Sequence, residues 1–349
     1  MDNITQTPFV RELASSDKRT RDKALESLTL FIRSRRDLQL VELLKIWKGL
    51  FFCFYHSDRP LTQQSLARSL SYTLVPSLPE QCLQSFLRAF WITMSRDFHS
   101  LDRLRLDKYL YLIRCYVGVA FDVLLKKGLL LLSSTRKQKG KGKGKRVDKE
   151  KGGLGKRKRG EVEETEPQPG EELEVWNELG TYLDMLEEGP LCPLNFDPAS
   201  DDTNEDPAVR MHKGPDGLRY HLLDIWLDEI EKVALVEVEG EGGNGERSME
   251  DGNVNAEAGN STLNNGENTK ENQMKKKRKQ LKEGVPMELL LRPIVGLHGK
   301  SISKMVRKRA GEVLDDERLV EWGVRERKRD EEEEEEEDDE QEGWGGIDG

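Results

Sequence analysis

The sequence predicts an all-α protein, a HEAT-like helical solenoid or bundle with long disordered charged insertions and tails. Residues 9–132 repeat apolar side chains at helical spacing, and no window shows the strict alternation that a sheet would need. By contrast, charged residues, Gly and Asn dominate the segments 135–170, 240–283 and 326–349, a composition too polar to form a core. Of the 349 residues only 35% are hydrophobic and 35% are charged, with a formal net charge of −10. We therefore expect one helical body rather than two full domains.

The first helices follow from apolar spacing and from the turns between them. The pair Ser16-Asp17 offers a suitable N-cap for a helix over 18–33. The next helix, over 37–55, is apolar on nearly every side, which predicts that other helices surround it. Pro60 then occupies a favoured first-turn position. Further helices are expected over 61–75, over 80–98 and from about 101, where the apolar stripe includes Leu101, Leu104, Tyr109, Leu112 and Leu124.

Two amphipathic segments downstream are expected to complete the same body. Residues 171–188 and 218–235 each place Leu and Trp side chains on one side of a helix, and such helices are only marginally stable alone. The run between the two parts is then an insertion, whose closure costs little even when it is long. We divide the chain into helices at 1–134, a disordered basic-then-acidic insertion at 135–170, completing helices at 171–239, a disordered linker with a basic cluster at 240–283, a weakly ordered segment able to fold on binding at 284–325, and a disordered basic-to-acidic tail at 326–349.

Three stretches in a fixed order along the chain carry a family resemblance. They are WKGLFFCFYHSDRPL at Trp47–Leu61, FWITMSRDF at Phe90–Phe98 leading into LDRLRLDKY at Leu101–Tyr109, and GLRYHLLDIWLDEI at Gly217–Ile230. Together they resemble the nucleolar ribosomal RNA processing protein 1 family, over roughly residues 9–132 and 171–238. The sequence departs from the family pattern in the Lys/Gly insertion at 136–160, and the resemblance is poor beyond residue 284.

The resemblance implies an all-helical, HEAT-like body found in early nucleolar precursors of the large ribosomal subunit. It also implies that the protein is needed for maturation of the large-subunit rRNA precursor, as a nuclear and nucleolar assembly factor without known catalysis. The implied partners are large-subunit pre-rRNA and preribosomal assembly proteins. We expect no cofactor, no small-molecule substrate, no membrane contact, and a single copy of the chain within a large ribonucleoprotein.

Charged residues near the helix turns are the candidates for partner or rRNA contacts. Asp58 and Arg59 either cap and solvate a helix end or present a contact at the edge of the solenoid. A second group consists of cations that lie off the apolar stripe of the helix beginning near 101, where a solvated face with i,i+3 or i,i+4 pairs is the alternative. The complete set of candidates is Asp58, Arg59, Arg96, Arg103, Arg105, Lys108 and Arg114.

Compact basic clusters lie in the segments predicted to be disordered. Arg136–Arg159 holds 13 Lys or Arg against two acids, and its glycines let it follow a phosphate backbone with an affinity that falls steeply with salt and reads no sequence. Clusters within it and at 275–279 also suit nuclear import, and a solubilising linker is the alternative. The cluster residues are Lys156, Arg157, Lys158, Arg159, Lys275, Lys276, Lys277, Arg278 and Lys279.

The acidic run from Asp330 to Glu340 contains 11 consecutive acids and stays extended by self-repulsion. It either solvates the tail, competes with RNA for the basic segments, or binds basic ribosomal proteins or histones. A chromatin- or histone-binding helical scaffold that uses this run is therefore the alternative function.

Patterns of catalytic and metal-binding residues are absent from the sequence. The five histidines show no H-x-x-x-H spacing, and the four cysteines form no C-x-x-C pair. Three of those cysteines lie in apolar helical patterns, which is typical of buried reduced thiols. The start of the chain has neither the basic nor the apolar region of a signal peptide. The sequence thus predicts a soluble, intracellular protein that is not an enzyme.

Overall fold

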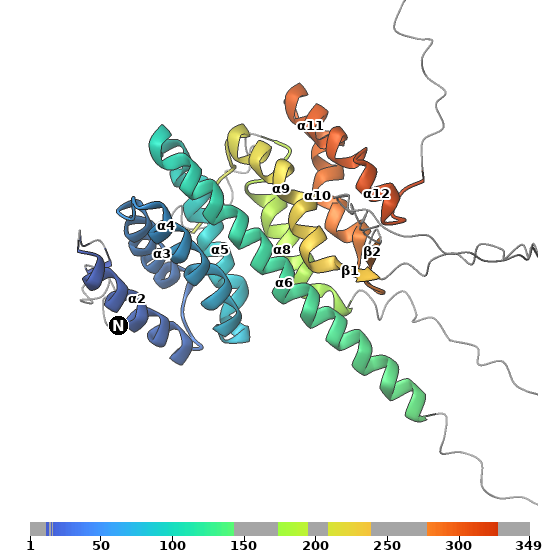
Figure 1. The fold of residues 1–349 in the computed structure, drawn as a ribbon, viewed down its shortest axis with the longest axis horizontal. Helices are drawn as coiled ribbons and strands as arrows, with labels where there is room; N and C mark the ends of the chain where they lie inside the picture. Colours follow the sequence, from blue (N-terminus) through green and yellow to red (C-terminus); the bar gives the residue numbers. More distant parts are fainter. Residues whose placement is uncertain are drawn as a thin grey trace, which may run out of the picture.

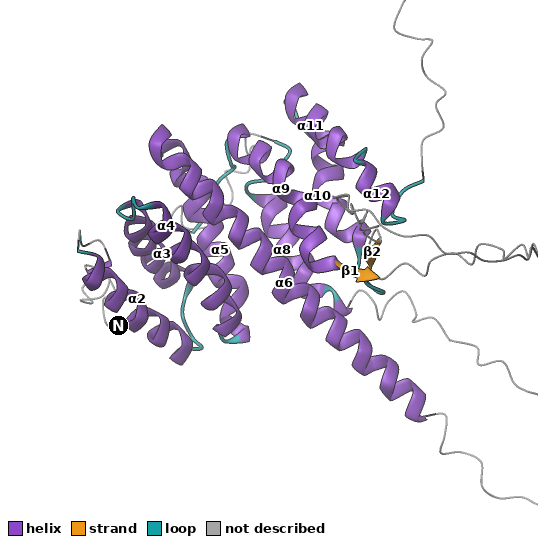
Figure 2. Ribbon diagram, viewed as in Figure 1, coloured by secondary structure: helices purple, strands orange, loops and turns teal. Residues whose placement is uncertain are grey.

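The computed structural model describes residues 12–13, 15, 17–142, 174–194, 209–238 and 278–326. This part of the chain is a row of packed helices with one small two-stranded sheet, which confirms the predicted all-α, HEAT-like class (Figures 1 and 2). The helices are α2 (Lys18–Ser34), α3 (Leu40–Tyr55), α4 (Pro60–Arg68), α5 (Glu80–Asp97), α6 (Arg103–Gly142), α8 (Asn177–Glu188), α9 (Asp216–Ala234), α10 (Met287–Lys300), α11 (Lys304–Leu314) and α12 (Glu317–Glu321).

Capping interactions set where the first two helices begin. The Asp17 carboxylate accepts the backbone N–H of Thr20 at 2.9 Å at the start of α2. At the start of α3, the Glu42 carboxylate accepts the backbone N–H of Gln39 at 3.0 Å. Each carboxylate satisfies a backbone donor that has no partner within the helix. The cap at Gln39 places the first residue of α3 at Leu40, three positions after the predicted start.

The region predicted as one helix over 61–75 is broken into three pieces. α4 ends at Arg68, a π-helical turn follows at Ser69–Thr73, and a 3-10 turn covers Val75–Ser77. Pro76 lies at the break. It has no N–H for an α-helical hydrogen bond, and its ring disfavours α-helical geometry in the residue before it.

A cluster of aromatic rings holds the N-terminal helices together. Trp47 of α3 is fully buried, and its ring centroid lies 5.3 Å from Phe86 and 5.0 Å from Phe90, both in α5. The same ring lies 5.2 Å from Tyr116 of α6, which stacks on Phe90 at 3.9 Å. Aromatic pairs contribute about 0.5–1.5 kcal/mol beyond the burial of their area. This cluster therefore fixes α3, α5 and α6 relative to one another.

Helix α6 crosses the row of helices and continues past it (Figure 1). Its 40 residues span about 60 Å at 1.5 Å per residue, and along that length it contacts α4, α8 and α9. The helix ends at Gly142, whereas we placed the start of the disordered insertion at 135. The physical reason is that Lys, Arg and Gln are good helix formers, so a change from apolar to basic composition does not by itself end a helix.

The downstream helices pack against α5, α6 and one another. The Trp176 ring covers Gly128 of α6 so closely that a Cβ added there would lie 2.0 Å from a ring carbon. In α9, Trp226 is buried and its indole N–H donates to the Leu290 carbonyl of α10 at 3.0 Å.

Residues 284–325, for which we expected weak order, contain three of the described helices. α10, α11 and α12 lie beside α8 and α9 at one end of the row (Figure 1). α11 illustrates why the sequence of this segment does not distinguish an ordered helix from a weakly ordered one. Its buried residues Val306, Ala310 and Leu314 keep helical spacing, but they are embedded among cations that lower the average hydrophobicity.

A small antiparallel sheet lies where the sequence showed no strand pattern. β1 (Leu235–Val238) pairs with β2 (Arg278–Leu281), with Leu235 opposite Leu281. Neither LVEV nor RKQL alternates strictly between apolar and polar residues, so neither shows the usual pattern of a half-buried strand. The pairing also corrects the predicted disordered linker at 240–283, because Arg278 and Lys279 belong to a strand.

One face of α3 is open to solvent, contrary to the prediction that other helices surround it. Val41 and Phe52 on this face are each 41% exposed. Leu104, which we assigned to the apolar stripe of its helix, is 92% exposed because it lies in the first turn of α6, before the buried stripe begins. Among the described helices, none combines the length and apolar character that a membrane crossing requires.

Candidate interaction surface

Lys108 and the end of α3 form a buried polar junction. Lys108 of α6 is only 5% exposed, and its Nζ donates to the carbonyls of Tyr55 at 2.8 Å and Ser57 at 3.2 Å and to Asp58 Oδ1 at 3.0 Å. An ammonium group has three donors, so these three bonds satisfy it. The positive charge also lies at the carbonyl end of α3, where the helix dipole favours it. Lys108 therefore joins α3, the following turn and α6, and it does not lie on the solvated face that we considered.

Arg105 completes this junction, one turn earlier in α6. Its Nη1 donates to Asp102 Oδ2 at 2.7 Å, and its Nε lies 3.4 Å from Asp58 Oδ1. The guanidinium carbon stands 4.3 Å from the centroid of the Tyr55 ring, a cation–π geometry. Asp58 thus binds two cations of the protein itself, and its role within the junction is to hold the turn after α3 against α6.

The charges of the junction shift the pKa values of its members. The hydrogen bond from Lys108 holds the pKa of Asp58 below its ordinary value, and Arg105 adds to the effect. The hydrogen bond from Arg105 likewise lowers the pKa of Asp102. Burial lowers the pKa of Lys108, although its hydrogen bond to Asp58 opposes that effect. Both carboxylates are therefore ionised at neutral pH.

Arg59 and Arg103 are the predicted cations that the junction leaves exposed. Arg59 immediately precedes α4, and Arg103 is the first residue of α6. Both are exposed, and neither forms an ion pair with any residue that the structure describes. Because Asp58 is bound by Lys108 and Arg105, it does not neutralise them. The turn after α3 and the start of α6 therefore carry free positive charge.

Arg114 lies farther along α6 and clamps this helix to α9. Its Nη2 donates to Asp228 Oδ2 at 2.8 Å, and its Nε donates to Glu229 Oε1 at 2.5 Å. Glu229 is 1% exposed, so it needs a nearby cation. Burial raises the pKa of Asp228, but hydrogen bonds from Arg318 and Arg114 outweigh that effect and lower it. Arg114 is thus a bridge between helices.

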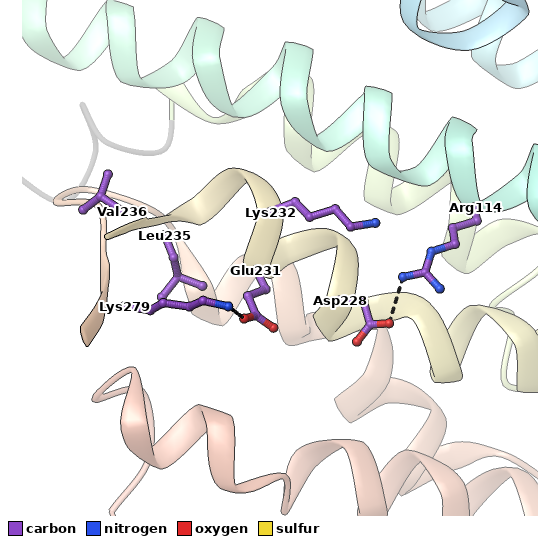
Figure 3. A pocket seen from close by; sticks show the side chains of 7 residues that line it. All are labelled: Arg114, Asp228, Glu231, Lys232, Leu235, Val236 and Lys279. Carbon is purple, nitrogen blue, oxygen red and sulfur yellow. Dashed lines mark hydrogen bonds and ion pairs between the residues drawn. The ribbon is translucent and has the colours of Figure 1, made fainter. Parts of the chain in front are cut away.

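A pocket of about 510 Å³ opens beside this clamp (Figure 3). Its cations are paired within the protein: Lys279 binds Glu231, and Lys232 donates to Glu229 at 2.6 Å. The pocket therefore has mixed charge and offers no free cation to an anionic ligand. The residues that line it are Arg114, Asp228, Glu231, Lys232, Leu235, Val236 and Lys279.

The remaining candidates do not join the junction. Arg96, at the end of α5, forms a two-bond pair with its neighbour Asp97 at 2.8 and 2.9 Å. The basic clusters at 156–159 and 275–277 lie outside the described residues. Of the rest of the second cluster, Arg278 belongs to β2 and Lys279 lines the pocket.

The outward face of α3 was not among the predicted contact residues. Val41, Lys45, Lys48, Phe52 and His56 follow one another at intervals of three or four positions, which places them on one side of the helix and the residue that ends it. That spacing was a visible signal. It was hidden because apolar residues occupy the other sides of the same helix as well, and the periodicity of the whole segment is weak.

Packed helices, with exposed cations at the turn after α3 and at the start of α6, define an all-α protein of the HEAT-like class. Residues 4–139 and 179–345 match the family described as Nucleolar protein, Nop52. Since this match takes in most of the chain, the chain belongs to this family of nucleolar proteins, and the predicted nucleolar location is confirmed.

Curated relatives agree with the resemblance that the three stretches indicated. Ribosomal RNA processing protein 1 homolog B of Homo sapiens is 31% identical over 233 residues, which cover 64% of this chain and 22% of the relative. Homolog B of Mus musculus is 42% identical over 123 residues, 33% of this chain and 17% of the relative. Homolog A of Homo sapiens is 37% identical over 125 residues, 34% of this chain and 27% of the relative. The matched regions thus span only 17–27% of the length of these relatives.

Proposed function

We propose that the chain is a non-enzymatic assembly factor for the large ribosomal subunit, needed for processing of the large-subunit rRNA precursor. In this role it acts as a scaffold that binds pre-rRNA and preribosomal assembly proteins. The observation that supports the proposal is the family match across both parts of the helical body, at 4–139 and 179–345. The relatives found with it carry names that refer to ribosomal RNA processing.

The charged residues take different parts in this proposal. Lys108, Arg105 and Arg114 position helices, since each is bound to acids or carbonyls of another element. Arg59 and Arg103 are free to contact a phosphate or an acidic partner. The basic run Arg136–Arg159 adds affinity for RNA that depends on salt and not on sequence.

Depletion of the protein from cells tests the proposal. Unprocessed large-subunit rRNA precursor should accumulate, and re-expression of the chain should restore its processing. Normal precursor levels after complete depletion would overturn the proposal. Recovery of DNA-bound histones in place of pre-rRNA after crosslinking would favour the chromatin scaffold instead.

A further inference from the structure

The outward face of α3 is a stripe that the rest of the described protein leaves uncovered. We call the residues Val41, Lys45, Lys48, Phe52 and His56 the α3 stripe. Lys48 and His56 are exposed, Lys45 is half-buried, and Val41 and Phe52 keep 41% of their surface open. From Lys45 to His56 the stripe covers about 16 Å at 1.5 Å per residue.

The stripe carries positive charge that nothing nearby neutralises. Lys45 and Lys48 form no ion pair with any of the residues that the structure describes. The single acid of α3 is Glu42, and its carboxylate is bound to the backbone of Gln39 at the start of the helix. Both lysines are therefore available to an anionic partner.

Aromatic rings accompany these cations. Phe52 is supported by the Phe51 ring, whose centroid lies 5.9 Å away in an edge-to-face arrangement, and Phe51 is itself buried against Tyr109. The rings of Tyr55 and His56 make a similar pair at 5.6 Å where the helix ends. The stripe thus offers aromatic surfaces that contacts with neighbouring rings hold in place. These rings lie at the end of the stripe nearest the exposed Arg59.

We propose that the α3 stripe binds single-stranded RNA, with Lys45 and Lys48 on the phosphates and with Phe52 and His56 stacking on unpaired bases. Cations that follow the backbone together with aromatic side chains that stack on bases are the features that single strands require. Paired bases in a duplex do not expose their faces for such stacking, so single strands are favoured over duplex RNA. This inference deepens the proposed function and rests on it.

A protein partner fits the stripe less well. The core of a protein interface is depleted in lysine and needs a continuous apolar patch. Here Val41 and Phe52 are separated by both lysines. The arrangement favours a polyanion with planar bases.

Binding of the whole chain to a single-stranded oligouridylate over a range of salt concentrations tests the inference. Replacing both lysines, Lys45→Gln with Lys48→Gln, should flatten the dependence of log affinity on log salt by about 1.4, because each phosphate contact on a single strand contributes about 0.7. The matched control is Lys304→Gln with Lys308→Gln, which removes the same charge from exposed positions of α11. The control should change the slope much less.

A second variant separates stacking from charge. Phe52→Leu keeps an apolar side chain but removes the ring, and it should weaken RNA binding by about tenfold while leaving the salt slope unchanged. Because Phe52 is half-exposed, the unfolding temperature of this variant should stay close to that of the wild type. This measurement serves as the folding control.

Two outcomes would overturn the inference. One is an unchanged RNA affinity for Phe52→Leu together with equal slopes for the two lysine pairs. The other is loss of a co-purifying preribosomal protein from the stripe variants at unchanged RNA affinity, which would assign the stripe to protein docking. Either result, combined with precursor accumulation on depletion, would refute RNA binding at the stripe and leave the proposed function standing.

Discussion

The two ends of the helical row are held together by different interactions. Around Trp47, the helices α3, α5 and α6 meet through aromatic rings in a dry core. Around Asp228, the helices α6 and α9 meet the C-terminal helices through ion pairs, since Arg114 and Arg318 both bind that carboxylate, at 2.8 and 2.9 Å. The comparison teaches that the first end depends on the packing of buried rings, whereas the second also needs charge balance at the buried Glu229 and the partly exposed Asp228.

The largest expected effect is loss of the central ring at the aromatic end. Trp47→Ala should lower the free energy of unfolding by about 3–5 kcal/mol, because it removes a fully buried ring and leaves a cavity among packed neighbours. Denaturant unfolding measures the change. The matched control is Phe52→Ala in the same helix, which should cost about 1 kcal/mol or less because its ring is half-exposed. Equal losses for the two variants would show that the core is not the source of stability.

At the charged end, the decisive residue is Arg114. Arg114→Ala should cost about 3 kcal/mol because it leaves the buried Glu229 with only the largely exposed Lys232 as its cation. Arg88→Ala is the control, since its pair with Glu188 is partly open to solvent and exposed pairs contribute about 0–1 kcal/mol. If both variants lost the same stability in denaturant unfolding, the contrast between buried and exposed acids would not hold.

The packing of Trp176, which precedes α8, against α6 can be weakened at Gly128. Gly128→Ala should destabilise the protein by about 2 kcal/mol, because the new Cβ would overlap the Trp176 ring and force it away from α6. Limited proteolysis should then cut residues 174–194 faster than in the wild type. Gly180→Ala is the matched control in α8, where an added Cβ meets nothing within 4 Å, and it should stabilise the helix by about 0.5–1 kcal/mol.

The smallest expected effect is a pH dependence of the folding stability that arises at the contact between α6 and α9. Burial lowers the pKa of His221, whose Nε2 lies 2.9 Å from the Leu110 carbonyl. As the pH falls below about 6.5, the unfolded chain takes up the proton before the folded one does, so stability is present above this pH and declines beneath it. Unfolding measured on both sides of about pH 6.5 should show this decline.

The variant that checks this assignment is His221→Gln. This substitution should remove the part of the loss of stability that sets in as the pH falls just below neutrality. The part due to Asp228 should remain, since the lowered pKa of that carboxylate makes it act only in more acidic solution. A decline near pH 6.5 that persists unchanged in the variant would assign it to another group.

Local signals explain how much of the fold was predictable. The start of α2 follows from Asp17 and from apolar spacing within a few turns, so sequence alone placed it. The docking of α10 could not be predicted in this way, because the bond from Trp226 to Leu290 joins residues 64 positions apart. The clamp from Arg114 to Asp228 spans 114 positions. Periodicity describes one helix at a time and does not indicate which charges meet.

The candidate surface shows the same limit. Asp58 and Arg59 were recognisable because a turn between two helices is marked in the sequence. Lys108 looked like a solvated cation, since it lies off the apolar stripe, yet its long side chain reaches the carbonyls at the end of another helix. The α3 stripe was overlooked because Phe52 belongs to a segment that is apolar on all sides, and only packing decides which apolar residues remain outside.

Gradient sedimentation of the tagged chain from cell extracts, followed by sequencing of the RNA that purifies with it, tests the central claim most directly. The proposed role in large-subunit assembly predicts that the chain sediments with preribosomal particles and that the recovered RNA is enriched in large-subunit precursor. Recovery of the chain with DNA-bound histones, and without pre-rRNA, would contradict it.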